Sequence, residues 1–441
     1  MLSHEQNRRL TETGAATPCG TVMRQFWQPA ALTEELTEER PVKAVRLLGE
    51  DLVLFRDEQG RYGLIDRHCP HRGADLSYGR PEDGGLRCPF HGWLFDVHGA
   101  CLEQPAEPAD SRFHTKVRAP NYPCIERNGI VFAWLGAGEP PALPAFDCIE
   151  APASHSFAFK GYLECNWLQA LEVGIDPAHA SFLHRYFEDD DPAGGYGLQF
   201  RDFTDGAAIP VTQILRNYPS PQIEVDATDY GLRIFALRAL NDNQMHVRVT
   251  NLAFPNAIVI PMSNEMIITQ WHVPIDDTHC WWYAMFSSFG GPVDQASMRA
   301  QRLQLYSLPD YRPRVGKAND YGFDPHEQRT RTFTGMGDDI NVHDQWAVES
   351  PGPLQDRTKE HLASSDRAIT ANRRLLQQAI DALAKGKALP VGASNGGDNA
   401  NGYRGPAAVD TIGAADSWRS VWQDYDSNRR RRCDWAHGAA D

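Results

Sequence analysis

Residues 172–184 concentrate side chains that bind transition metals. They read Glu-Val-Gly-Ile-Asp-Pro-Ala-His-Ala-Ser-Phe-Leu-His and include Asp176, His179 and His184. Two imidazoles from one segment and a carboxylate from elsewhere in the chain make the 2-His-1-carboxylate triad, which leaves positions on iron(II) open for oxygen. The segment therefore indicates a mononuclear iron site. The alternative is a pair of ordinary histidines on an amphipathic helix.

The spacing of these residues restricts the local backbone. Asp176 and His179 are three positions apart, so they would share one face of a helix that begins at Pro177. His179 and His184 are five positions apart, which is about 140 degrees round an ideal helix. Both imidazoles can reach one metal ion only if the helix ends or bulges between them.

A second set of metal-binding side chains lies upstream. The chain reads Cys69-Pro-His71 and, after sixteen residues, Cys88-Pro-Phe-His91. Such pairs at loop tips can clamp a metal centre between two fingers of a sheet. A structural zinc ion is one interpretation, but its ligands usually form Cys-Cys and His-His pairs. A Rieske [2Fe-2S] centre fits the mixed pairs better, because two cysteines bind one iron and two histidines bind the other.

Strand-like runs surround the Cys/His pairs. Residues 45–48, 52–56 and 62–66 are separated by turns rich in Gly and Asp, which predicts a small antiparallel β domain whose loops carry both pairs. The apolar run 129–135 closes this domain, and the proline-rich stretch 139–144 links it to the next one.

The middle of the chain predicts a second, larger antiparallel sheet. Six strand-like runs alternate with Asp, Gly and Asn turns, at 222–225, 232–237, 246–252, 257–260, 266–272 and 281–286. We expect Trp281, Trp282 and Phe286 to lie in the core rather than in a pocket. A helix with Ser365 as N-cap and a stop at Gly386 is expected to pack one apolar face on the sheet.

These elements indicate an α+β chain with two main domains, residues 41–145 and 146–390. Residues 1–40 are expected to pack on the second domain through their aromatic side chains. Residues 391–441 would form a Gly/Asn-rich linker, flexible over 392–405, and a tail whose tryptophans dock on this subunit or a neighbour.

Composition excludes several classes of protein. The 441 residues are 41% hydrophobic and 23% charged, as in globular proteins, and the net charge of -15 argues against a nucleic-acid partner. No apolar run resembles a signal peptide or approaches the roughly 18 residues of a membrane helix, so we expect a soluble, cytoplasmic protein. Nine cysteines do not suggest a disulfide framework, and we expect Cys101 and Cys124 to be structural.

The Cys/His pairs carry a family resemblance. Cys69-Pro-His71-Arg-Gly-Ala and Cys88-Pro-Phe-His91-Gly-Trp resemble the Rieske motif of aromatic-ring-hydroxylating oxygenases. The resemblance implies that the two cysteines hold the inner iron and the two histidines the outer iron.

Two further positions distinguish branches of Rieske proteins. Those of respiratory complexes resemble the chain too, but they add one cysteine to each loop for a disulfide. Ala74 and Phe90 stand at those positions, which points to the oxygenase branch.

Glu172-x3-Asp176-x2-His179-x4-His184 resembles the mononuclear iron motif of the same family. The resemblance implies that the two histidines are iron ligands. It implies that Asp176 hydrogen-bonds a ligand histidine and, in trimeric relatives, connects it to a cluster histidine of the neighbouring subunit. Glu172 is a weaker candidate for lining the site.

The third ligand is expected to be Asp344, because the sequence after it resembles the phthalate-dioxygenase-like subgroup around its ligand aspartate. Asp338 and Asp339 are rivals for this role. His343 is expected to be a surface residue.

The resemblance implies an N-terminal Rieske domain and a catalytic domain of the helix-grip type, in which an antiparallel sheet wraps round helices. It also implies an oxygenase that carries a [2Fe-2S] cluster and Fe2+ and is a homotrimer or hexamer. No Gly-x-Gly-x-x-Gly opens a βαβ unit in the sequence. NAD(P)H would therefore act through a separate flavin and iron-sulfur reductase, with or without a ferredoxin.

The expected substrate is a small aromatic molecule, first of all an aromatic carboxylate of the phthalate or phenoxybenzoate type. Arg248 and Arg216 are candidates for binding its carboxylate, because a guanidinium can pair with it bidentately. The alternatives are an O- or N-demethylating monooxygenase acting on a substrate without a carboxylate, a protein that only carries electrons, and a zinc-stabilised binding protein.

Overall fold

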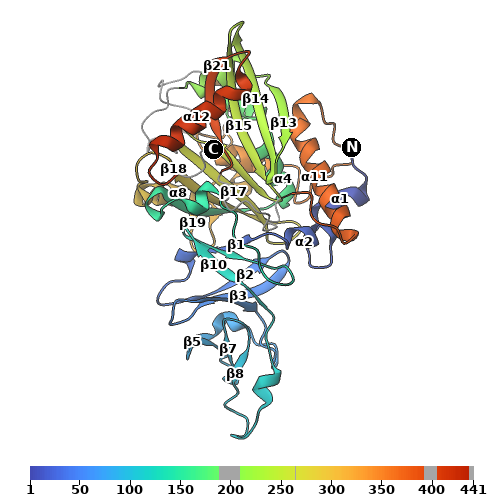
Figure 1. The fold of residues 1–441 in the computed structure, drawn as a ribbon, viewed down its shortest axis with the longest axis vertical. Coiled ribbons are helices and arrows are strands. Elements are labelled where there is room, and N and C mark those ends of the chain that lie inside the picture. The colour runs from blue at the N-terminus through green and yellow to red at the C-terminus, as the bar shows by residue number, and fades with distance from the viewer. Residues whose placement is uncertain (188–208, 264, 392–404, 437–441) are drawn as a thin grey trace.

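The computed structural model describes residues 1–187, 209–263, 265–391 and 405–436 (Figure 1). Most of the stretch predicted to be flexible, residues 392–404, lies outside the described residues. Within the described residues, no helix combines the length and the apolar composition needed to cross a lipid bilayer.

Three small antiparallel sheets form the lower part of the molecule in Figure 1. The first contains, in spatial order, β2 (Val42–Leu47), β3 (Glu50–Arg56), β4 (Tyr62–Asp66) and β9 (Asn121–Tyr122). The second contains β5 (Arg80–Glu82), β6 (Gly85–Arg87), β7 (Leu94–Asp96) and β8 (Cys101–Glu103). The third contains β1 (Gln28–Leu32), β11 (Ile130–Ala133) and β10 (Cys124–Arg127). The predicted antiparallel β domain is confirmed.

A large antiparallel sheet forms the upper part of the molecule. Its order is β12 (Ser156–Leu163), β18 (Cys280–Ser288), β17 (Met266–Pro274), β16 (Ala257–Pro261), β15 (Gln244–Ala253), β14 (Gly231–Asn241) and β13 (Gln222–Ala227), and β21 (Val409–Ala414) also pairs with β15. All six predicted runs are strands of this sheet. The sequence did not indicate β12 and β21.

Helix α4 (Trp167–Ile175) lies against the large sheet, where it contacts β15, β16 and β17, and it also contacts α10 (Ile340–Glu349) and α11 (Arg367–Ala384). Seven of its nine residues are buried, and five of these seven are apolar. A Cβ on Gly174 would lie 2.1 Å from Ile258 Cδ1 of β16, so glycine permits the close approach of helix and sheet. This arrangement confirms the expected sheet wrapped round a helix.

Helix α11 confirms the helix predicted between Ser365 and Gly386. It begins one residue later than expected, because a 3-10 turn at Ser364–Asp366 precedes it and Asp366 is its N-cap. It ends before Gly386, whose φ of +64° is the left-handed conformation of a helix stop.

Both terminal segments pack on the upper part. Helices α1 (His4–Thr11) and α2 (Pro18–Met23) contact α11, and Phe26 packs edge-on against Phe254 with ring centroids 5.5 Å apart. At the other end, α12 (Trp418–Arg432) contacts β21 and β15 and packs two tryptophans against Phe235.

The remaining helices, strands and turns complete the described part of the chain. They are α3 (Asp147–Glu150), α5 (Ala180–Leu183), α7 (Val211–Asn217), α8 (Gln295–Leu305), β19 (Tyr306–Ser307), β20 (Arg312–Pro313), α9 (Pro325–Thr330), and 3-10 turns at Thr33–Glu35, Leu76–Tyr78, Phe113–Lys116, Ala153–His155 and Lys317–Gly322.

Candidate metal centres and substrate cavity

Two histidines flank the short helix α5. Helix α4 ends at Ile175, and Asp176 is its C-cap. The Asp176 Oδ1 atom then accepts a hydrogen bond from the Ala178 amide at 2.8 Å, which turns the chain. His179 and His184 stand immediately before and after α5. The predicted helix start at Pro177 is therefore wrong, but the predicted helix end between the two histidines is confirmed.

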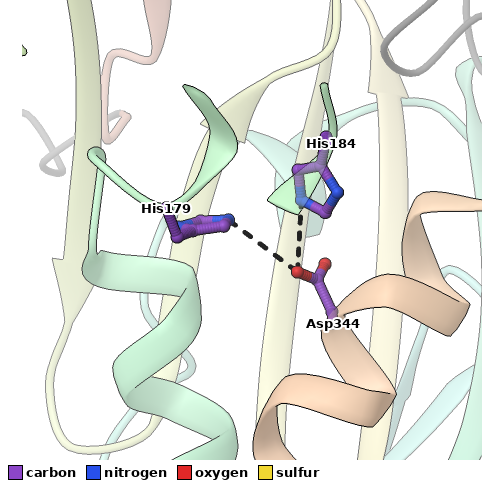
Figure 2. Close-up of side chains that lie close together, drawn as sticks. All are labelled: His179, His184 and Asp344. Atoms are coloured by element: carbon purple, nitrogen blue, oxygen red, sulfur yellow. Dashed lines mark ion pairs between the residues drawn. The ribbon is translucent and has the colours of Figure 1, made fainter. Parts of the chain in front are cut away.

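The carboxylate of Asp344, on α10, faces both imidazoles (Figure 2). Its Oδ1 atom lies 3.2 Å from His184 Nε2 and 3.8 Å from His179 Nε2. The three candidate ligand atoms lie within 4.8 Å of one another, and they form the only such group of three or more found in the described part of the chain. Two nitrogens and one carboxylate oxygen in this arrangement can bind Fe2+ and leave positions open.

The rival acids have other partners. Asp338 is half-exposed and its Oδ2 accepts a hydrogen bond from Arg331 at 2.6 Å. Asp339 caps α10 by accepting the Asn341 amide at 3.0 Å. The structure therefore brings Asp344, and neither rival, to the two histidines.

Both imidazoles present Nε2 to Asp344 because their Nδ1 atoms are engaged. The Nδ1–H of His179 donates to the backbone carbonyl of Asp176. His184 Nδ1 lies 3.3 Å from His343 Nδ1, and His343 Nε2 lies 3.0 Å from the Gly337 carbonyl. Since a carbonyl can only accept, His343 donates from Nε2 and accepts at Nδ1, so His184 donates from Nδ1. Both Nε2 lone pairs are then directed to the candidate metal position.

The expectation that His343 is a surface residue is wrong. It lies on the inner side of α10 and none of its surface is exposed. Burial and the neighbouring His184 lower the pKa of His343, which favours the uncharged form that this hydrogen-bond chain requires. A partner of this kind orients a ligand imidazole.

The charges of the three candidate ligands suit a divalent cation. Burial lowers the pKa of His179, against the opposing effect of Asp176 and Asp344. Burial alone would raise the pKa of Asp344, but the neighbouring His184 and His179 lower it below its ordinary value. Neutral imidazoles and an ionised carboxylate are the forms that bind metal.

Two acids, Glu172 on α4 and Asp176 at its C-cap, have different surroundings. Asp176 lines the cavity beside the triad, and its Oδ2 lies 3.9 Å from His179 Nδ1. Glu172 is buried elsewhere, where Arg373 Nε donates to it at 2.6 Å and Arg357 Nη2 at 3.0 Å. The expectation that Glu172 lines the site is therefore wrong, since it is the partner of two buried arginines.

The two loops that carry the Cys/His pairs have the same backbone pattern. In the first, the Cys69 amide donates to Ala74 and the Gly73 amide to Cys69, each at 2.9 Å. In the second, the amides of Cys88 and Gly92 make the equivalent bonds at 2.8 and 3.0 Å. The two glycines have φ values of +73° and +76°, a conformation that favours glycine.

The side chains of the two loops fit an iron-sulfur cluster. The rings of His71 and His91 lie 4.4 Å apart, and His71 stacks on Trp93. Their Nδ1 atoms are buried and have no hydrogen-bond partner among the described residues, which is costly unless a ligand occupies them. Burial raises the pKa of the Cys69 thiol to about 12, and the nearby Cys88 adds to this effect. Two buried thiols and two unsatisfied imidazole nitrogens match the donor set of a Rieske centre.

A cavity lies between α4 and the large sheet, beside the triad. Alternate residues of β17, Ile268, Gln270 and His272, face it, as does Trp282 of β18. Trp282 therefore lines the cavity, against expectation, because its register opposite His272 turns it to the same face. Phe286 is completely buried in the core, as expected.

The two candidate arginines occupy different places. Arg248 of β15 lines the cavity, and its guanidinium binds Asp410 of β21 and, through Nη2, the Pro261 carbonyl at 3.1 Å. Arg216 of α7 is not among the lining residues, and its Nη1 lies 3.4 Å from the Tyr186 carbonyl.

Comparison with known proteins identifies the family. A model described as "Rieske [2Fe-2S] domain" matches residues 26–123, and one described as "LigXa C-terminal domain like" matches residues 137–424. The phthalate 4,5-dioxygenase oxygenase subunit of Pseudomonas putida is 37% identical over 88% of each chain. The chain belongs to the Rieske oxygenase family.

Other relatives of this Rieske oxygenase differ in their substrates. The tert-butanol monooxygenase / tert-amyl alcohol desaturase oxygenase subunit of Aquincola tertiaricarbonis is 33% identical over 87% of this chain and 77% of its own. The structure of the NdmA QL mutant of Pseudomonas putida CBB5 with caffeine covers 84% of this chain and 94% of its own, with a TM-score of 0.58 and 19% identity, and so supports the fold alone.

Membership of the family decides two questions that the sequence left open. The protein is an oxidoreductase that uses dioxygen, and the match of residues 26–123 to the Rieske [2Fe-2S] domain supports an iron-sulfur cluster rather than a zinc ion there. Sequence reasoning missed the contributions of His343 and Asp410. The position of His343 next to Asp344 was a usable signal, whereas nothing in the sequence connects Asp410 with Arg248, 162 positions away.

Proposed function

We propose that this Rieske oxygenase is the oxygenase component of a multicomponent system that hydroxylates or oxidatively demethylates a small aromatic substrate. The observation that carries the proposal is the meeting of His179, His184 and Asp344 beside a cavity that is largely apolar. The cavity is the substrate site because it is open to the triad and is lined mainly by side chains that exclude water.

We assign Cys69, Cys88, His71 and His91 to the [2Fe-2S] cluster. The triad of His179, His184 and Asp344 would hold Fe2+. When bound, the cluster supplies single electrons and the iron supplies the position at which dioxygen is activated. The protein orients the imidazoles through Asp176 and His343. The Asp176 carboxylate, 3.9 Å from His179 Nδ1, would join His179 to a neighbouring subunit.

The proposed assembly is a homotrimer or hexamer. The loops that hold the cluster lie at the lower end of the molecule, whereas α4 and the triad lie in its upper part (Figure 1). This separation favours a short path between the cluster of one subunit and the triad of the next. In the cytoplasm, NAD(P)H would supply the electrons through a separate flavin and iron-sulfur reductase, directly or through a ferredoxin.

The proposed substrate is an aromatic carboxylate of the phthalate or phenoxybenzoate type, and an aryl ether or amine that is demethylated is the second candidate. The name of the Pseudomonas putida relative supports the first, and the name of the Aquincola relative shows that uncharged substrates occur among relatives. In both cases the apolar side chains Ile258 and Ile260 of β16 and Ile268 of β17 would hold the ring.

Metal analysis and oxygen uptake together test the proposal. Reconstituted protein should contain three irons and two sulfides per chain, two of the irons in the cluster, and should consume oxygen when a reductase, NADH and an accepted substrate are present. His184→Ala should lose one iron and the activity but keep the Rieske spectrum. The matched control His326→Ala changes an exposed histidine of α9 and should change neither. Full activity in His184→Ala would reject the assigned site.

A further inference from the structure

Strand β21 completes the large sheet beside β15. The short strand β16 pairs with β15 only at Asn251–Ala253, and β21 pairs with the preceding part, from Gln244 to Val249. In this register Asp410 lies directly opposite Arg248. A residue far along the chain thereby becomes the partner of Arg248, which lines the candidate substrate cavity.

Asp410 is engaged by two basic side chains. The Nη1 atom of Arg248 donates to its Oδ2, and His246 Nε2 lies 3.0 Å from its Oδ1. Asp410 and Arg248 are exposed by only 6% and 7%, so little water screens the pair. Two opposite charges so close in a buried wall largely cancel at the distance of a bound ligand.

This cancellation matters because of what else lines the cavity. Arg248 is the only arginine or lysine among the described lining residues, and Asp176 and Asp344 are acidic. A guanidinium without a carboxylate partner would attract an anionic group of a substrate. With Asp410 bound to its guanidinium, Arg248 offers a substrate carboxylate at this wall little net positive charge.

We propose that Asp410 is a specificity-determining residue of the oxygenase. By compensating Arg248, it makes the wall formed by β15 accept an uncharged polar group of the substrate, such as an ether, hydroxyl or amide oxygen, in place of a carboxylate. The inference rests on the proposed function, in which this cavity binds the substrate. For an aromatic acid, the carboxylate would lie away from β15.

Binding of benzoate and benzamide to the iron-loaded, full-length protein tests the inference, because the two probes have similar shapes and differ in charge. Binding can be followed by isothermal titration calorimetry. Asp410→Asn should raise the affinity for benzoate relative to benzamide by about tenfold or more, since a charged hydrogen bond becomes available. Asp416→Asn, which changes an exposed acid just after β21, should leave this ratio unchanged.

Arg248→Gln supplies an opposite test. It leaves Asp410 without its guanidinium partner, so the affinity for benzoate relative to benzamide should fall. The double variant Arg248→Gln with Asp410→Asn should return this ratio to within about twofold of wild type. If Asp410→Asn does not fold, Arg248→Gln alone still tests the inference through the expected fall in the ratio of benzoate to benzamide affinity. A change below about twofold in the folded single variants, or a lower benzoate affinity in Asp410→Asn, would overturn the inference.

Oxygen uptake keeps the two proposals apart. If the affinity for benzoate relative to benzamide changes as expected but none of the aromatic substrates is oxidised, the role of Asp410 stands and the proposed substrate class is rejected. If the protein is active but the affinity for benzoate relative to benzamide does not change in the variants, the role of Asp410 is rejected and the proposed function stands.

Discussion

The candidate iron site depends on which nitrogen of each imidazole is free. The Nδ1 atom of His179 is bound by a backbone carbonyl, and that of His184 by a second histidine whose own partner is a carbonyl. Both arrangements engage Nδ1, so the two imidazoles present Nε2 toward Asp344 without needing the metal to orient them.

His343→Phe should weaken iron binding. The substitution keeps the ring volume but removes the atom that accepts from His184, so the ligand ring loses its orientation. We expect a loss of about 10–100-fold in iron affinity, measured by competition with a chelator. His343→Gln, which keeps an acceptor, should fall between Phe and wild type. Unchanged iron affinity in His343→Phe would show that the contact with His184 has no role in orientation.

Asp176→Asn should keep iron and nearly abolish turnover. His179 is oriented by the backbone carbonyl of Asp176, which the substitution leaves in place, so the metal content should not change. The carboxylate itself is what joins His179 to a neighbouring subunit in the proposed mechanism. Metal analysis and single-turnover reduction rates provide the check, and normal activity would rule out this role.

At the residue scale, spacing was enough to identify the Cys/His pairs and the two histidines near α5 as candidate metal ligands, because each set lies within short local segments. Asp344 was expected only through the family resemblance, and the structure does place it against both histidines. The role of His343 depends on which side of α10 faces the site, and a single sequence does not contain that information.

At the scale of elements, α4 is held in place by a buried group of charges. Glu172 on α4 accepts hydrogen bonds from Arg373 of α11 and from Arg357, and Arg373 also binds Glu360. Burial alone would raise the pKa of Glu172, but the two arginines lower it below its ordinary value of 4.5. The carboxylate thus ties α4, the helix that leads into the candidate iron site, to α11.

Glu172→Gln should destabilise the fold by about 3 kcal/mol at neutral pH, because it leaves two buried arginines short of a negative charge. Since the folded pKa of Glu172 is depressed, its contribution is fully present above about pH 4.5 and is lost as the pH falls through the folded pKa. The difference between wild type and variant should therefore shrink in acid. Urea unfolding at several pH values measures it.

The exposed acid Glu107 provides the control for that series. Glu107→Gln should leave the free energy of unfolding unchanged at every pH at which the protein remains folded. A Glu172→Gln difference that stays constant from neutral to acid pH would contradict the assigned pKa depression.

The sequence predicted six strands of the large sheet because their apolar runs are bounded by clear turns. It did not indicate β12, in which the buried Lys160 interrupts an otherwise aromatic and apolar run. That lysine is tolerated because Glu35 accepts from it at 2.7 Å and because it lies over the Trp281 ring. The helix predicted to begin at Pro177 is not observed there. Helix α4 begins ten residues earlier and ends before the proline.

At the scale of the whole molecule, the two candidate metal centres lie in different parts of one chain (Figure 1). The parts are joined firmly, since Glu35, which follows β1, pairs with Lys43 of β2 and with Lys160 of the large sheet. A large hinge movement that would bring the cluster loops to the triad of the same chain would have to break this buried group. Transfer between subunits avoids that cost.

Mixed oligomers test transfer between subunits. One variant, His184→Ala, lacks the mononuclear site, and another, His71→Ala, lacks a cluster ligand, so neither should be active alone. Co-expressed in equal amounts, they should recover roughly a quarter of wild-type activity, because that share of interfaces joins an intact cluster to an intact triad. Transfer within one chain predicts no recovery, since no chain carries both sites.

Oligomeric state depends on contacts between subunits, which a single sequence does not encode in a readable pattern. Sedimentation of the purified protein should show a mass three or six times that of the chain. The relation between the two parts was equally beyond the sequence. Lys43, Glu35 and Lys160 lie in three separate elements, and only the folded chain brings them together.

The pairing of β21 with β15 also bears on how the protein is made. Asp410 is translated 162 residues after Arg248, so during synthesis the edge of β15 stays open and its arginine lacks that carboxylate. Contacts so distant along a chain form late and slowly. The last of the described strands therefore supplies the partner of a cavity-lining arginine, and a nascent chain that stalls or is clipped before Val409 would carry both metal-binding motifs while Arg248 still lacked Asp410.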